Sequence, residues 1–134
     1  MVDYSLAAEV ARPYGETVEA VRSALAEQGF GILTEIDLRA TLAAKLGVDV
    51  PAQVILGACR PPLAYQALQV DPSIAVMLPC NVVVRAVDET TSVVEAFNPD
   101  VMLELGDTSA LQPVAQDAKD RLTAVLAAVT EETR

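Results

Sequence analysis

The sequence predicts an α+β fold: a two-layer sandwich with a mostly antiparallel sheet, helices on one face and a long C-terminal helix. Three observations lead to this prediction. Short runs rich in Val, Ile and Leu alternate with segments whose apolar residues recur every three or four positions. Two strand patterns, 81–87 and 92–97, are separated by a short polar loop, as in an antiparallel hairpin. The 134 residues contain no linker, repeat or low-complexity segment, which predicts a single domain, 1–134.

The N-terminal part of the chain is expected to form a strand and then a helix. Residues 5–11 favour a strand, which Pro13 ends. Residues 16–28 favour a helix, because their apolar residues recur at spacings of three and four. Gly29 suits the C-terminal stop of that helix.

Residues 30–36 are predicted to form a second strand, whose side chains alternate between two faces. One face then holds Phe30, Ile32, Thr34 and Ile36. The other face holds Gly31, Leu33, Glu35 and Asp37. Asp37 also stands where the N-cap of a helix over 38–46 belongs, and Gly47 ends that helix.

The middle of the chain continues with a buried strand over 53–58 and a helix over 63–70. Asp71-Pro72 ends this helix, because the residue before a proline avoids helical angles. Residues 74–78 fit either a strand or a turn.

The last third begins with the strands 81–87 and 92–97, joined by a hairpin loop over 88–91. Asn98-Pro99 breaks the second strand, and Asn98-Pro99-Asp100 is interpreted as a turn. A helix over 109–129, the longest of the chain, carries a continuous apolar stripe.

Composition excludes several classes of function. The net charge of -10, with no cluster of three basic residues, makes nucleic acid and anionic membranes poor partners. The chain has no histidine, which excludes Ser-His-Asp and Cys-His catalysis as well as histidine-ligated metal sites. Neither a Walker loop nor a Gly-x-Gly-x-x-Gly pattern is present, which argues against the usual nucleotide enzymes.

The cellular location predicted from the sequence is the cytoplasm. The first ten residues contain Asp3 and Glu9 but no basic residue, unlike a signal peptide. The most apolar stretch, 74–84, is too short to span a bilayer and is interrupted by Pro79 and Asn81. Two cysteines in a reducing compartment are expected to be free thiols.

The candidate site centres on Cys59, which lies between a strand and a helix that Pro61 or Pro62 can begin. Unpaired N–H groups and the helix dipole at that junction favour an anion. Arg60 adds positive charge, so the junction favours the thiolate form of Cys59. A small anionic ligand is therefore a possible partner.

Cys80 opens the strand at 81–87, directly after Pro79. If the ends of the two strands adjoin, the sulfurs of Cys59 and Cys80 can bridge reversibly or chelate a soft metal such as Cu(I). Two thiolates are too few ligands for structural zinc. The alternative is that both cysteines are small buried core residues.

Glu35 and Asp37 lie two residues apart on the predicted strand, so their side chains share a face. One interpretation is an acid–base pair or a site for a hard cation. The interpretation we favour is structural: Asp37 caps the next helix, and Glu35 is solvated or pairs with an arginine.

A homodimer is the predicted assembly. Residues 74–84 are apolar at successive positions, which indicates that both faces of the sheet, or one face and an edge, are covered. In so small a chain the second cover can be another subunit, although burial within one subunit is the alternative.

Four motifs together resemble the family catalogued as domain of unknown function 302. They are Gly31-Ile-Leu-Thr-Glu-Ile-Asp37, Ile55-Leu-Gly-Ala-Cys-Arg-Pro-Pro-Leu-Ala64, Leu78-Pro-Cys-Asn-Val-Val-Val84 and Asn98-Pro99. Family members more often have asparagine where this chain has Arg60. The resemblance implies a self-associating α+β domain similar to the TATA-binding-protein-like fold, and it implies no catalytic mechanism. It does not carry DNA binding with it, since fold alone does not fix function.

The leading functional prediction is a cytoplasmic, homodimeric, non-enzymatic binding or sensory module. Its expected site is a cleft that joins Cys59, Arg60, Cys80, Glu35 and Asp37. One alternative is a thiol redox protein or enzyme, with Cys59 as nucleophile and Cys80 as resolving thiol. Another is a purely structural interaction protein. No catalytic residue, metal ligand or cofactor is assigned from the sequence.

Overall fold

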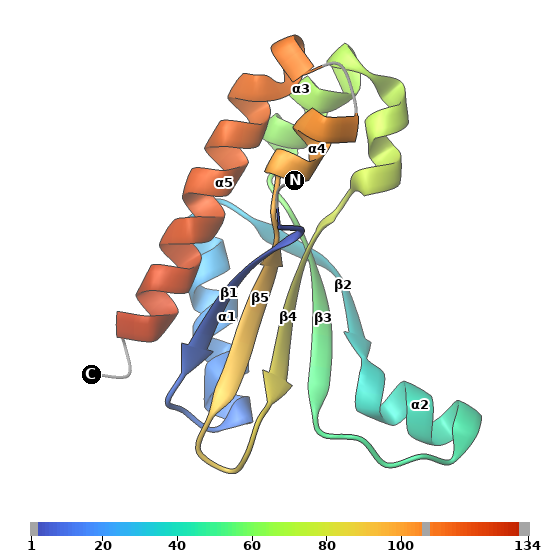
Figure 1. Ribbon diagram of the computed structural model, residues 1–134, viewed down its shortest axis with the longest axis vertical. Helices are drawn as coiled ribbons and strands as arrows, with labels where there is room; N and C mark the ends of the chain where they lie inside the picture. The colour runs from blue at the N-terminus through green and yellow to red at the C-terminus, as the bar shows by residue number, and fades with distance from the viewer. Residues whose placement is uncertain (1–2, 106–107, 132–134) are drawn as a thin grey trace.

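The computed structural model describes residues 3–105 and 108–131 of the chain. Strands and helices alternate through most of this length (Figure 1). Their bounds are β1 Ser5–Val10, α1 Tyr14–Glu27, β2 Gly31–Asp37, α2 Leu38–Leu46, β3 Gln53–Cys59, α3 Pro61–Val70, the 3-10 helix η1 Pro72–Met77, β4 Cys80–Ala86, β5 Ser92–Phe97, α4 Asp100–Leu105 and α5 Thr108–Glu131.

The strands form one sheet in the order β1-β5-β4-β3-β2, and every neighbouring pair is antiparallel. Helices α1 and α5 pack together on one face of this sheet (Figure 1). We call the opposite face, which no described helix covers, the open face. This arrangement confirms the predicted α+β class, the β4–β5 hairpin and the long C-terminal helix.

Local chemistry sets several of the element ends. The Asp37 carboxylate accepts a hydrogen bond from the Ala40 N–H at 2.9 Å and so caps α2, as predicted. Gly47 ends α2 with a φ of 68°, in the left-handed region that glycine adopts without strain. Pro61 and Pro62 occupy the first positions of α3, where a missing N–H costs little.

The interior consists of two hydrophobic clusters. The larger one, which we call the sheet core, packs α1 and the C-terminal part of α5 against the covered face, and its fully buried members include Leu25, Leu56 and Leu122. The smaller one lies beyond the end of the sheet, among α3, η1, α4 and the N-terminal part of α5 (Figure 1). We call this second group of elements the helical cap. It buries Leu63, Ala67, Ile74, Met102, Leu111, Val114 and Ala118.

The predicted alternation along the second strand is wrong beyond Ile32, because β2 contains a β-bulge. Ile32 pairs with Ala58 and Thr34 pairs with Gly57, so Leu33 is an extra residue and is 65% exposed. The bulge moves later side chains to the opposite face from the one that regular alternation gives them. Glu35 and Asp37 still share a face with each other.

Two other segments differ from the sequence prediction. Residues 74–78, which fitted either a strand or a turn, belong mostly to η1. The Asn98-Pro99-Asp100 segment leads into α4, a helix that the sequence did not predict. The Asn98 side chain accepts a hydrogen bond from the Asp100 N–H at 3.1 Å and donates one to the Asp3 carbonyl at 2.9 Å. It therefore acts as an N-terminal cap and not only as a turn residue.

The open face mixes apolar and polar side chains, since the strand register also places Ser5, Glu9, Gln53 and Asn81 on it. Its half-buried apolar side chains are Ile55, Val83, Val93 and Phe97. Among them, Arg85 forms an ion pair with Glu95, which also accepts a hydrogen bond from the Ser5 hydroxyl at 2.9 Å. These two hydrogen bonds, Arg85 first, lower the pKa of Glu95. The charges of Arg85 and Glu95 therefore offset each other, whereas Glu9 on the same face is exposed.

Candidate functional site

The two cysteines lie at adjoining strand ends. Cys59 is the last residue of β3, and Cys80 is the first residue of β4. Cys80 pairs with Ala58 across the ladder, so Cys59 is one residue beyond the partner of Cys80. The ends of β3 and β4 that carry the two cysteines therefore adjoin.

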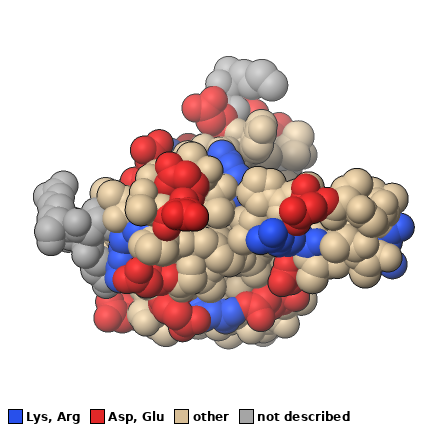
Figure 2. All heavy atoms as spheres, turned by 90° about the horizontal axis from the view of Figure 1, so that it is seen from below, with Lys and Arg blue, Asp and Glu red and all other residues tan. Residues whose placement is uncertain are grey.

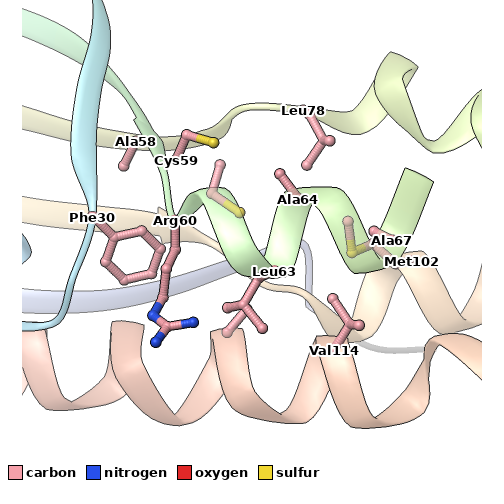
Figure 3. A pocket seen from close by; sticks show the side chains of 12 residues that line it. Phe30, Ala58, Cys59, Arg60, Leu63, Ala64, Ala67, Leu78, Met102 and Val114 are labelled. Carbon is pink, nitrogen blue, oxygen red and sulfur yellow. The ribbon is translucent and has the colours of Figure 1, made fainter. Parts of the chain in front are cut away.

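Both thiols line one small cavity, which we call the seam pocket because it lies between the sheet core and the helical cap. Its volume is about 30 Å³, which is room for one or two water molecules. Figure 3 shows its lining of mainly apolar side chains. The lining residues are Phe30, Ala58, Cys59, Arg60, Leu63, Ala64, Ala67, Leu78, Cys80, Met102, Val114 and Ala118.

The two thiols are free and differ in exposure. Cys59 is half-buried, whereas Cys80 is 8% exposed. Burial, and after it the neighbouring charge of Cys59, raises the pKa of the Cys80 thiol from 9.0 to about 11. At neutral pH the Cys80 thiol is therefore protonated unless a ligand displaces the proton.

Arg60 lines the seam pocket, but its charged end lies elsewhere. Figure 3 shows its guanidinium directed toward α5 and away from the Cys59 sulfur. Its Nη1 is 4.0 Å from an Asp117 carboxylate oxygen, a long ion pair. Its Nε is buried and has no hydrogen-bond partner among the described residues. The expectation that Arg60 adds its positive charge beside the Cys59 thiol is therefore not what the structure shows.

The start of α3 lacks the unpaired N–H groups that the sequence predicted. Pro61 and Pro62 have no N–H to offer. The next two N–H groups, of Leu63 and Ala64, both donate to the Arg60 carbonyl at 3.0 and 3.1 Å. The prolines that begin the helix thus remove the donors for an anion, and only the helix dipole remains.

The two carboxylates lie apart from the thiols, so the cleft predicted to join all five residues is wrong. Asp37 pairs with Val54, five residues along β3 from Cys59, or about 17 Å at the rise of a strand. Both carboxylates line a different hollow, between α1 and the far ends of β2 and β3.

Each carboxylate already has a partner there. Glu35 forms an ion pair with Arg22 of α1, and Asp37 caps α2. Burial, and after it the charge of Asp37, raises the pKa of Tyr14 in the same hollow. These interactions match the structural interpretation that the sequence favoured for Glu35 and Asp37.

Sequence reasoning missed Met102, whose thioether belongs to the lining of the seam pocket. It lies in α4, the helix that the sequence did not predict. The signal was present in Asn98-Pro99-Asp100, since a cap residue, a proline and an acidic residue in the first turn are typical of a helix start.

Three further observations bear on partners. In the described residues no group of three or more His, Cys, Asp or Glu side chains is placed to hold a metal ion. Over the same residues, no helix has both the length and the apolarity that a membrane crossing requires. Acidic and basic side chains are intermixed on the end of the molecule shown in Figure 2.

Comparison with known proteins places the chain in a family. The family model described as Domain of unknown function DUF302 matches residues 6–129. The chain is also similar to a solved structure, the crystal structure of an uncharacterized conserved protein DUF302 from Bacillus stearothermophilus. That similarity has a TM-score of 0.83 and 27% sequence identity, and covers 99% of this chain and 100% of the other. No protein with a curated description matches the chain. The chain belongs to the DUF302 family.

Proposed function

We propose that the protein is a non-enzymatic binding or sensory module whose site is the seam pocket. One observation carries this proposal: two unbonded thiols, on neighbouring strands, line one cavity between the sheet core and the helical cap. A ligand held there contacts both halves of the molecule. Its binding therefore stabilises the packing of the cap on the sheet, which is how a sensory module reports occupancy.

The size and chemistry of the pocket argue for binding and against catalysis. A volume of about 30 Å³ is far below the roughly 300–1,000 Å³ of pockets that take organic ligands. Acid–base catalysis also needs a titratable group within hydrogen-bond reach of the reacting atom. Here the lining supplies only the two thiols and Arg60, whose guanidinium is directed away from Cys59.

The thiol redox protein is the alternative. In that mechanism the Cys59 thiolate attacks a disulfide substrate and displaces one of its sulfurs as a thiolate. The Cys80 thiolate then attacks Cys59 in the mixed disulfide, which releases the reduced substrate and leaves a Cys59–Cys80 disulfide. Burial opposes the second step, because a thiol with a pKa of about 11 is ionised in only about one molecule in ten thousand at pH 7. The half-buried Cys59 is the thiol that a reagent reaches first.

The experiment that tests the binding module uses arsenite, a small dithiol reagent, with reduced protein. Saturating arsenite should raise the melting temperature by roughly 10 °C, as a ligand at about 100 times its Kd stabilises by ~2.7 kcal/mol. Cys59→Ala and Cys80→Ala should each abolish the shift. Leu46→Ala, an exposed truncation in α2, is the matched control and should keep it.

Two results contradict the proposal. The first is a wild-type protein that does not respond to arsenite. The second is a pair of cysteine variants that respond as the wild type does. Either result favours the purely structural role, in which Cys59 and Cys80 only fill space between the two clusters.

We propose in addition that two copies associate through the open face. Ile55, Val83 and Val93 are apolar on a sheet face where polar residues are the rule for a solvated antiparallel sheet. For a chain at -10, approach is easiest through a surface whose central charges, Arg85 and Glu95, neutralise each other. Sedimentation equilibrium should show a dimer, and Val83→Glu should give monomers. A wild-type protein that stays monomeric at 100 times the protein concentration of the arsenite experiment contradicts the proposed dimer.

A further inference from the structure

The seam pocket brings together soft sulfur donors in a lining with few other ligand atoms. Cys59 and Cys80 are neighbours on adjacent strands, and both are free thiols. Met102 contributes a thioether to the same lining. Among the other lining residues only Arg60 carries a polar side chain, and its guanidinium has no lone pair to offer a metal. Soft thiolate and thioether ligands favour Cu(I), zinc and iron–sulfur clusters among the biological metals.

The number of ligands that the pocket can supply limits which metal ion it can hold. Zinc in structural sites takes four ligands, and calcium takes six or more oxygens. The described residues hold no group of three or more His, Cys, Asp or Glu side chains that could supply such a set. A volume of about 30 Å³ accommodates a single ion but no organic molecule of ordinary size. The pocket therefore fits a soft ion of low coordination number.

We propose that the ligand of the seam pocket is Cu(I), held between the thiolate sulfurs of Cys59 and Cys80. This assignment rests on the binding function proposed above and names its ligand. Binding breaks the two S–H bonds and forms two Cu–S bonds. The two protons pass to solvent, and neither copper nor sulfur changes oxidation state. The half-buried Cys59 meets the ion first, and the buried Cys80 then closes over it.

The complex of two thiolates and one Cu(I) carries one net negative charge, which is costly to bury without a positive group nearby. Arg60 is the positive side chain of the lining, but its guanidinium is directed toward α5, with Nη1 4.0 Å from an Asp117 carboxylate oxygen. We therefore expect solvent at the half-buried Cys59 to offset most of this charge, and Arg60→Gln to change the affinity for Cu(I) by less than about threefold.

Met102→Leu tests whether the third sulfur of the lining takes part in binding, and Leu46→Ala, an exposed truncation in α2, is the matched control. In the view of Figure 3, Ala64 lies between Cys59 and Met102, so the thioether is set apart from the Cys59 sulfur. Met102→Leu conserves side-chain volume and apolarity while removing that sulfur. If the two cysteines are the ligands, this variant keeps its affinity for Cu(I) within about threefold of wild type.

The test is an anaerobic titration of the reduced chain with Cu(I), in competition with a colorimetric Cu(I) chelator such as bathocuproine disulfonate. We expect one ion per chain and a loss of more than about 100-fold in affinity for Cys59→Ala and for Cys80→Ala. Proton release in weak buffer should approach two per ion. That measurement uses only the wild-type protein, so it stands even if a cysteine variant fails to fold.

Separate outcomes overturn separate claims. Cysteine variants that bind Cu(I) as wild type does, or release of no protons, overturn the ligand assignment. So does a Met102→Leu variant whose loss equals that of the cysteine variants. If arsenite stabilises the protein through both cysteines but Cu(I) does not bind, the ion is wrong and the binding module stands. If neither reagent acts through the cysteines, both proposals fail.

Discussion

The ionisable side chains near the two ends of β3 differ in the partners that the protein gives them. At one end, Glu35 pairs with Arg22 and Asp37 caps α2, so each carboxylate has a partner within the protein. At the other end, Cys59 and Cys80 carry unbonded thiols into an apolar cavity. Local stability explains the carboxylate end, whereas at the thiol end two cysteines that form no disulfide line a cavity. This difference is why the proposed site lies at the thiol end.

The largest expected effect is on the packing of the thiol end. Leu63 is 8% exposed and belongs to both the helical cap and the lining of the seam pocket. Leu63→Ala should lower the free energy of unfolding by about 3 kcal/mol, through lost burial and a larger cavity. Urea denaturation measures this change. Leu46→Ala, at a site 69% exposed in α2, is the control and should change stability by less than about 0.5 kcal/mol. Equal losses of stability for Leu63→Ala and Leu46→Ala would contradict the prediction that the two ends of the molecule differ in packing.

The second effect is a loss of stability in alkali. The pKa of Cys80 is about 11 in the folded protein against an ordinary 9.0, so the folded state holds this proton more tightly than the unfolded state does. The resulting stabilisation is complete below pH 9 and is lost as the pH rises to 11, by up to about 2.7 kcal/mol. Comparison of the wild type with Cys80→Ala isolates it, and Tyr14→Phe removes the contribution of Tyr14, whose pKa is also raised. Identical alkaline profiles for wild type and Cys80→Ala contradict the prediction.

The third effect concerns the backbone beside the thiols. A Cβ on Gly57 overlaps the Thr34 hydroxyl and lies 2.8 Å from Pro79 Cγ, in the segment that leads to Cys80. Gly57→Ala should therefore destabilise by about 2 kcal/mol through overpacking. The double variant with Thr34→Ala should recover part of that loss, since it removes one of the two overlaps. Thermal unfolding of both variants is the measurement, and an undiminished loss in the double variant places the strain at Pro79 alone.

The smallest effect is expected at the carboxylate end. Asp37→Ala removes the cap of α2 and should cost about 1 kcal/mol. Because α2 has no fully buried residue, the loss should stay local and leave the thiols unchanged. Alkylation rates of Cys59 and Cys80, followed by mass spectrometry, should equal those of the wild type. A changed rate at either cysteine shows that the two ends are coupled.

The residues that sequence reasoning placed well are those with local signals. Asp37 and Gly47 were expected at the two ends of α2, and both are there, because caps depend on a few neighbouring backbone groups. The hairpin of β4 and β5 followed from its alternation and its loop. The sequence did not predict that the ends of β3 and β4 adjoin, because that contact depends on the order of the strands in the sheet.

The sequence predictions were wrong where the outcome depends on contacts between residues far apart in the chain. The bulge at Leu33 places Thr34 and Ile36 on the face opposite to the one that regular alternation predicts. No local residue type predicts such an extra residue. The five-residue cleft failed because the thiols and the carboxylates lie at opposite ends of an antiparallel pair. The free N–H donors expected at the start of α3 are absent, because the N–H groups of Leu63 and Ala64 both donate to the Arg60 carbonyl.

By itself the sequence determined the α+β class, the strand-to-helix junction at Cys59 and the exclusion of histidine chemistry. Those properties follow from composition, periodicity and local caps, which act over a few residues. The tertiary structure alone decided that Cys59 and Cys80 share a cavity, that Met102 joins their lining, and that Glu35 and Asp37 do not. The reason is that strand pairing and the packing of α4 and α5 join residues far apart in the chain, and no local pattern encodes those contacts.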